Sequence, residues 1–158
     1  MYLIELSSSE NELTQILGDM SSDTYLLNNI GSTLFLSTNR EAANQKIVKV
    51  DANNPSEDNW VDVIPETKNV LNPSTGAGYI FAEYMIDANS KVYQYDYEGN
   101  LIREIELPGI GSIGSVSGKK EDRELYYSFT NYITPPSIYK LSPESGSSEI
   151  YKLSQSKF

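Results

Sequence analysis

The stretch GIGSIG at residues 109–114 matches the pattern G-x-G-x-x-G, with which dinucleotide-binding proteins hold a pyrophosphate. In those proteins a helix begins at the third glycine, and its amino terminus binds the phosphates. The residues that follow Gly114 are SVSGKK, a pattern that predicts a strand and a turn instead of a helix. We therefore expect no cofactor, and we interpret the glycines as small residues on a crowded innermost strand of a sheet.

Carboxylates occur in three close pairs, all of them in predicted loops. The pairs are Glu57 with Asp58, Asp96 with Glu98, and Glu121 with Asp122. General acid and base catalysis needs two carboxylates directed at one bond, and the spacing of these pairs does not indicate such an arrangement. The segment 96–100 also lacks the length and the distal glutamate of a calcium loop. We interpret the three pairs as solvated loop residues.

The sequence contains no histidine and no cysteine. Disulfides and thiolate metal sites are therefore excluded, and the most common general base is missing. A Ser-His-Asp triad cannot be completed, and no G-x-S-x-G elbow is present. We expect no catalytic and no metal-ligating residue in this chain, and the sequence alone assigns no binding residue.

Arg40 lies at the end of a predicted strand, in the segment Asn39-Arg40-Glu41. Arginine at such a position commonly fixes a neighbouring loop through bidentate hydrogen bonds. Ligand binding is the alternative, because loop ends often carry function. We expect the structural role.

Lysine and arginine total 12 against 22 for aspartate and glutamate, which gives a formal net charge of -10. We expect no nucleic-acid partner, because neutralising phosphates requires a basic surface. No apolar run approaches the roughly 20 residues of a membrane span, and the amino terminus shows no signal-peptide pattern. We expect a soluble protein without a membrane partner, either cytoplasmic or periplasmic.

A five-residue pattern occurs four times: two apolar residues, a long polar residue, an apolar residue, and then Asp or Ser. It begins at Leu3, Ile47, Val92 and Ile138, at intervals of 44, 45 and 46 residues. A repeat of this length that is rich in short strands is typical of four-stranded propeller blades. HEAT and armadillo repeats are as long but helical, whereas these segments alternate with period two and are rich in Val, Ile and Tyr.

The chain is therefore predicted to be all-β, with about three four-stranded β-propeller blades plus part of a preceding blade. The predicted units are 1–18, the last two strands of an incomplete blade, and blades at 19–66, 67–107 and 108–158. Since a closed propeller needs at least four blades, we expect a fragment of a larger protein. We also expect the fragment to self-associate, because blade faces that are normally buried would be wet.

Individual strands are predicted from alternation and turn residues. Their ranges are 2–6 and 13–17 with a turn at 7–12; 24–28, 33–38, 46–51 and 59–64; and 69–72, 78–85, 91–96 and 101–107. In the last unit, a turn at 145–147 is predicted within the final hairpin. Residues 52–58 are predicted to form a loop, and a single helical turn begun by Ser56 with Asp58 and Trp60 is the alternative. Gly99 is expected to supply a positive φ in the hairpin 96–100.

Several motifs, in order between Tyr25 and Leu141, together resemble the propeller domain of the prolyl oligopeptidase (prolyl endopeptidase) family. They are Thr38-Asn39-Arg40-Glu41 with Asn44, the run 54–60, Ile64-Pro65-Glu66, the run 114–120, Ser128-Phe129-Thr130, Thr134-Pro135 and Ile138-Tyr139. The chain departs from the family at Pro136, where glycine is more frequent, and at Thr67, where histidine is common. Neither position has a catalytic role.

The resemblance implies a fragment of a seven-bladed propeller that covers an α/β-hydrolase domain not included in these residues. Enzymes of that family are serine peptidases that cleave short peptides after proline, and their propeller limits access to the active site. The expected partners are the hydrolase domain of the parent chain and, through the parent, short proline-containing peptides. The alternatives are a standalone propeller-like module that binds a peptide or protein without catalysis, and a purely structural scaffold.

Overall fold

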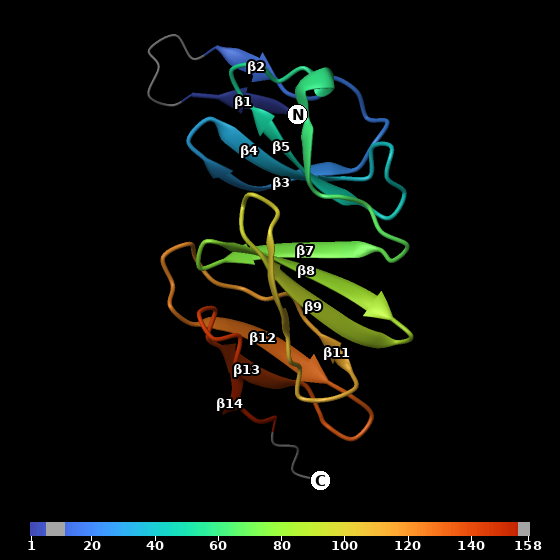
Figure 1. Cartoon of the computed structure of the whole chain (residues 1–158), viewed down its shortest axis with the longest axis vertical. Coiled ribbons are helices and arrows are strands. Elements are labelled where there is room, and N and C mark those ends of the chain that lie inside the picture. Colours follow the sequence, from blue (N-terminus) through green and yellow to red (C-terminus); the bar gives the residue numbers. More distant parts are fainter. Residues whose placement is uncertain (6–11, 155–158) are drawn as a thin grey trace. The chain divides into compact units, whose positions relative to one another are not determined.

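The computed structural model describes residues 1–5 and 12–154, which divide into two compact units at 1–67 and 68–158 (Figure 1). The described strands form three four-stranded antiparallel sheets and one two-stranded sheet. Within the described residues the only helical segment is a single 3-10 turn, η1 (Glu57–Asn59). The predicted all-β architecture is therefore confirmed. None of the helical structure described is long and apolar enough to span a membrane.

The unit 1–67 contains a hairpin and one four-stranded sheet. Its strands are β1 (Tyr2–Ile4), β2 (Leu13–Gln15), β3 (Thr24–Ile30), β4 (Thr33–Thr38), β5 (Lys46–Asp51) and β6 (Val61–Ile64). The predicted hairpin at 2–6 and 13–17 is present but shorter, and its turn lies, apart from Glu12, outside the described residues. The strand predicted at 59–64 begins only at Val61, because η1 occupies the preceding residues. The alternative of a helical turn was therefore correct.

The unit 68–158 contains two four-stranded sheets. Their strands are β7 (Leu71–Gly76), β8 (Tyr79–Ile86), β9 (Asn89–Tyr95), β10 (Leu101–Ile105), β11 (Ser112–Ile113), β12 (Leu125–Thr130), β13 (Ser137–Leu141) and β14 (Ser148–Lys152). The prediction of a strand at 69–72 was wrong in its placement, since β7 continues through Pro73 to Gly76. Proline is tolerated there because β7 is an edge strand of its sheet.

Every four-stranded sheet has the same topology, in which each strand pairs with the next one along the chain. The repeated patterns that begin at Ile47, Val92 and Ile138 fall on β5, β9 and β13, the third strand of each sheet. The periodic signal in the sequence therefore marks equivalent strands. The first copy begins on β1, and its residues 6 and 7 lie outside the described part of the chain.

The fourth strand of each four-stranded sheet carries a β-bulge, a point at which it has one residue more than the strand with which it pairs. The register skips Val63 in β6, Ile102 in β10 and Tyr151 in β14. In β3, the first strand of its sheet, the register skips Leu27 in the same way. Such bulges bend the strand and increase its local twist.

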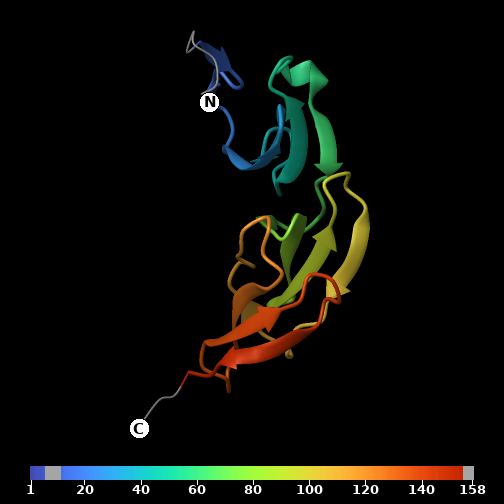
Figure 2. The same cartoon turned by 90° about the vertical axis from the view of Figure 1, so that its left-hand side faces the viewer.

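Each unit has its own hydrophobic core. In the unit 1–67, Ile16 after β2 packs with side chains of β4 and β5, among them Leu36 and Val48. In the unit 68–158 the core lies between its two sheets, which face each other in Figure 2. This second core contains Phe81, Val92, Ile105, Val116, Leu125, Tyr127, Phe129, Tyr139 and Leu141. Its tyrosine rings stack, with the centroids of Tyr127 and Tyr139 5.6 Å apart.

Candidate functional site

The glycine-rich segment 109–114 is a packing element. No helix follows Gly114 in the structure; the segment leads into β11, which pairs with β12. A Cβ atom on Gly111 would lie 2.4 Å from the carbonyl oxygen of Thr130, and one on Gly114 would lie 2.6 Å from Oγ of Ser128. The crowding at these two glycines comes from β12 and the residue next to it. The prediction of glycines on a crowded innermost strand holds only in part, because β11 contains none of the three glycines and no atom lies within 4 Å of the Cβ position of Gly109.

Gly111 also connects three loops of the unit 68–158. Its amide donates to Oδ1 of Asn89 at 3.0 Å, and its carbonyl accepts from the amide of Ser90 at 2.9 Å. On its other side it lies against Thr130 and Asn131 at the end of β12. The close approach of backbone that glycine permits here is thus used to join neighbouring loops.

Two of the three acidic pairs, Asp96 with Glu98 and Glu121 with Asp122, lie in loops as predicted, whereas Glu57 and Asp58 lie in the 3-10 turn η1. In each of the two loops, one aspartate binds the local backbone. Oδ1 of Asp96 accepts hydrogen bonds from the amides of Glu98 and Asn100 at 3.0 and 2.8 Å, and Gly99 in the same turn has φ 88°. Oδ2 of Asp122 accepts from the amide of Lys119 at 2.7 Å. Within the described residues, no group of three or more acidic side chains is arranged to hold a metal ion.

Arg40 fixes two loops of the unit 1–67, as the sequence predicts. Its Nη1 lies 3.1 Å from Oδ1 of Asp19 and 2.9 Å from Oγ of Ser21, and its Nε lies 2.5 Å from Oε2 of Glu57. The hydrogen bond from Arg40, together with those from Ser21, holds the pKa of Asp19 below its usual value. Nearby, Asn44 donates its backbone amide to Glu66 and its side-chain amide to the Thr67 carbonyl. These motifs therefore position loops, and Arg40 already has its ionic partners.

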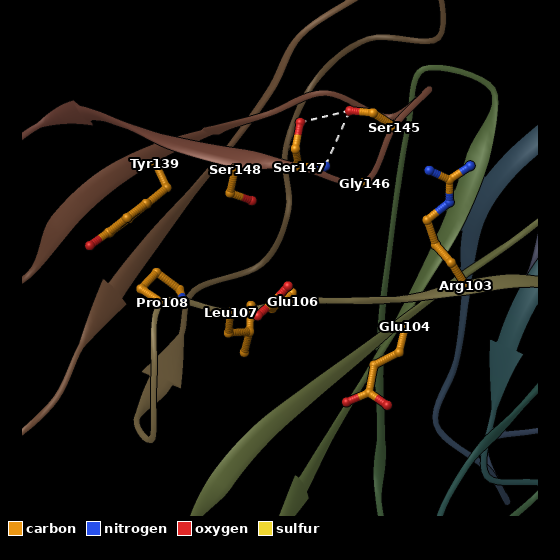
Figure 3. Close-up of a pocket in the computed structure, with 10 residues that line it drawn as sticks. All are labelled: Arg103, Glu104, Glu106, Leu107, Pro108, Tyr139, Ser145, Gly146, Ser147 and Ser148. Atoms are coloured by element: carbon orange, nitrogen blue, oxygen red, sulfur yellow. Dashed lines mark hydrogen bonds between the residues drawn. The ribbon is translucent and has the colours of Figure 1, made fainter.

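A cleft in the unit 68–158 lies between β10 with its following loop and the turn that joins β13 to β14 (Figure 3). Its volume is about 540 Å³. The lining residues are Arg103, Glu104, Glu106, Leu107, Pro108, Tyr139, Ser145, Gly146, Ser147 and Ser148. The turn takes its shape from Gly146, whose φ is 76°, which allows the side chain of Arg103 to lie against it.

The cleft has polar groups that are available for binding. Within the described part of the chain, neither Arg103 nor Glu106 forms an ion pair or a side-chain hydrogen bond, whereas Glu104 is bound to Lys91 at 2.6 Å. The hydroxyls of Ser145 and Ser147 lie 2.7 Å apart on the opposite wall (Figure 3). A free guanidinium can bind a carboxylate through two parallel hydrogen bonds. The cleft can therefore bind polar groups, but it contains no general base paired with a nucleophile.

The sequence did not indicate this cleft. The turn at 145–147 was predicted, but the residues opposite it come from a different sheet, more than 30 residues earlier in the chain. The only signal available was a positively charged residue, Arg103, in a strand of sequence LIREI. Without the packing of one sheet on the next, that signal cannot be distinguished from an ordinary solvent-facing residue.

In the unit 68–158, two successive four-stranded antiparallel sheets, each built as a meander, pack on each other through a hydrophobic core, an arrangement that defines the class of β-propeller blades. Comparison with known proteins identifies the family of propellers to which these blades belong. The family model described as "Prolyl oligopeptidase, N-terminal beta-propeller domain" matches residues 1–154. The chain therefore belongs to the propeller family of the prolyl oligopeptidases, and the resemblance in the sequence motifs is confirmed.

Individual relatives agree with this assignment. Over all 158 residues the chain is 46% identical to the prolyl endopeptidase of Elizabethkingia miricola and 42% identical to that of Elizabethkingia meningoseptica, and it spans 22% of the length of each. A solved structure from a study of two prolyl endopeptidases has a TM-score of 0.84 at 26% identity and covers 92% of this chain and 22% of its own. Apo prolyl oligopeptidase B from Galerina marginata has a TM-score of 0.82 at 21% identity, over 96% and 22% of the two chains.

Proposed function

We propose that these residues are the propeller portion of a serine peptidase that cleaves short peptides after proline, and that they act as an access filter over its catalytic domain. The observation that carries the proposal is the 46% identity to a prolyl endopeptidase along the whole chain. One similar solved structure is described in terms of inter-domain dynamics in catalysis and specificity. A propeller that limits entry to an active site acts through such inter-domain contacts.

The proposed partners follow from this function. The α/β-hydrolase domain of the parent protein supplies the catalytic residues, and short proline-containing peptides reach them past the propeller. We place the blade boundaries at 1–18, 19–66, 67–107 and 108–158. The four-stranded sheets at 24–64, 71–105 and 112–152 support this division, as does the separation of two compact units between Thr67 and Lys68.

The test is cleavage of a short chromogenic peptide with proline before the scissile bond. The 158-residue chain is compared with the protein encoded by its complete natural reading frame. We expect cleavage only by the complete protein, because the chain has no histidine to complete a triad. Failure of both proteins to cleave would reject the peptidase and favour the alternative of an interaction module without catalysis.

We also infer that the 158-residue chain self-associates in isolation. Large apolar side chains are exposed on and beside its last strand, β14, where Ile150, Tyr151 and Leu153 are 55%, 63% and 54% exposed. Neighbouring exposed apolar groups of this size promote association. Static light scattering over a range of concentrations measures the effect, and a constant monomeric mass at high concentration would contradict it.

A further inference from the structure

The cleft beside Arg103 contains a buried hydroxyl that lacks a hydrogen-bond partner. Ser148, at the start of β14, lines the cleft, and its Oγ is shielded from solvent. The hydroxyl of Tyr127, a residue that is 2% exposed, lies next to it: burial raises the pKa of Tyr127, and the Ser148 hydroxyl acts in the opposite direction. Within the described residues, neither hydroxyl forms a hydrogen bond of good geometry. Because buried polar groups are ordinarily paired, this pair of hydroxyls beside a cleft indicates a site for a polar ligand.

The cleft also contains two opposite charges without ionic partners. Arg103 comes from β10, and Glu106 is the first residue after that strand. Glu104, the third charged residue of the lining, is already bound to Lys91. Within the described part of the chain, the unpaired charges of the lining therefore cancel. A cleft of this kind complements a neutral zwitterion better than it complements an anion or a cation.

The turn between β13 and β14 fixes the position of the guanidinium. A Cβ atom on Gly146 would lie 2.6 Å from Cδ and 3.2 Å from Nη1 of Arg103, so the glycine makes room for the arginine to lie against the turn. The hydroxyls of Ser145 and Ser147 belong to the same turn (Figure 3). A carboxylate bound by both arms of the guanidinium would therefore also meet hydroxyl donors.

We propose that the Arg103 cleft binds a small zwitterion, a free amino acid or a short peptide with unblocked termini. The carboxylate binds the guanidinium of Arg103 and the hydroxyls of the turn, and the ammonium binds Glu106. The two residues are three positions apart at the end of an extended strand, which separates their Cα atoms by roughly 10 Å. An extended dipeptide, roughly 7 Å long, fits between their side chains. The volume of about 540 Å³ lies within the range of roughly 300–1,000 Å³ that is usual for small-molecule sites.

The apolar part of the lining fits the uncharged part of such a ligand. Leu107, Pro108 and Tyr139 lie between the charged and the hydroxyl-bearing groups of the cleft (Figure 3). Inorganic phosphate is the alternative occupant, but it would place about two negative charges near Glu106 without a second unpaired cation in the lining. The site is independent of the proposed peptidase function, because all of its groups belong to the unit 68–158.

The test is the binding of glycylglycine to the complete protein, measured as a titration by saturation-transfer difference NMR. Glycylglycine has both terminal charges and contains no proline. We expect saturable binding that weakens at least about tenfold when one charge is removed, as in N-acetylglycylglycine or glycylglycine amide. Arg103→Gln should abolish the preference for a free carboxylate, and Glu106→Gln should abolish the preference for a free amine. Arg123→Gln, which removes an arginine outside the cleft, is the matched control and should bind as the natural protein does.

Three results would overturn the proposal. Absence of saturable binding would show that the cleft is not a site for a zwitterion. Equal affinity for glycylglycine and N-acetylglycylglycine, or displacement of glycylglycine by a lower concentration of inorganic phosphate, would show a simple anion site. Undiminished binding to Arg103→Gln would place the dipeptide elsewhere on the protein. The comparison of blocked and free dipeptides uses the natural protein, so it remains decisive if a variant fails to fold.

Discussion

Gln94 on β9 donates a hydrogen bond from Nε2 to the carbonyl oxygen of Pro143, 2.9 Å away and 49 residues later in the chain. The bond joins one four-stranded sheet to the turn between β13 and β14 of the next. Gln94 is completely buried, and its Oε1 makes no hydrogen bond. A long polar side chain therefore fixes the packing of two blades at a position where an apolar residue would ordinarily lie.

Replacing Gln94 tests how much this contact contributes. Gln94→Ala removes the donor and leaves a cavity, so we expect the free energy of unfolding to fall by about 2 kcal/mol. Gln94→Met fills most of the space and removes the unpartnered oxygen, and its loss should be smaller. Denaturant unfolding of both variants measures the difference. An alanine variant as stable as the original chain would show that the bond does not hold the sheets together.

The glycines of the segment 109–114 should differ in their tolerance of a methyl group. Gly111→Ala places a Cβ atom 2.4 Å from the carbonyl oxygen of Thr130, so we expect a loss of about 1–3 kcal/mol in the free energy of unfolding. Gly109→Ala is the matched control, because no atom lies within 4 Å of its Cβ position. Thermal unfolding compares the two. Equal effects would contradict the packing role assigned to Gly111.

The ion pair between Arg40 and Asp19 predicts an acid-dependent part of the stability. Since hydrogen bonds from Arg40 hold the pKa of Asp19 below that of the unfolded chain, the stabilisation is present above the unfolded pKa of about 3.9 and is lost as the pH falls through the folded pKa. The melting temperatures of the original chain and of Asp19→Asn should differ at neutral pH and converge in strong acid. A difference that is constant with pH would exclude this linkage.

Tyr84 predicts the opposite dependence at high pH. Burial, with smaller effects of Tyr95 and Tyr93, raises the pKa of Tyr84 to about 12. The unfolded tyrosine ionises at about 10, so the stability that Tyr84 contributes below that pH declines as the pH rises to about 12. Ultraviolet titration should show an ionisation near 12 that is lost in Tyr84→Phe. Its persistence in Tyr84→Phe would assign the ionisation to another tyrosine.

The sequence predicts the sheets better than the contacts between them. Alternation and turn residues place the third strands correctly, because β5, β9 and β13 are central in their sheets and have the clearest pattern. β7 was misplaced because Pro73 and Gly76 resemble strand breakers, although an edge strand accepts both. The role of Gln94 could not be predicted. The pattern gives Gln94 and Lys140 the same position, yet Gln94 is buried against the next sheet, whereas Lys140 binds Glu124 and Glu149.

The candidate sites also divide into those that the sequence predicts and those that only the fold reveals. The tethering role of Arg40 was predicted from its place at the end of a strand, although its partners Asp19 and Glu57 come from other segments. The loop position of two acidic pairs was also predicted, but the hydrogen bonds of Asp96 and Asp122 to the local backbone were not. The Arg103 cleft consists of residues that different strands bring together. Exposed Ile110 and Ile133 cannot be told from core residues by their type, because only the fold shows that their side chains point outward.

The irregular edges of the sheets restrict how this chain can aggregate. The fourth strands of the three sheets, β6, β10 and β14, each carry a bulge. Of the first strands, which form the opposite edges, β3 is bulged, β7 contains Pro73, and β11 has only two residues. A growing fibril needs a flat, regular edge on which the next strand can be templated. None of these edges provides one. Assemblies of the folded chain should therefore form through side chains on blade faces, dissociate on dilution, and bind no amyloid dye.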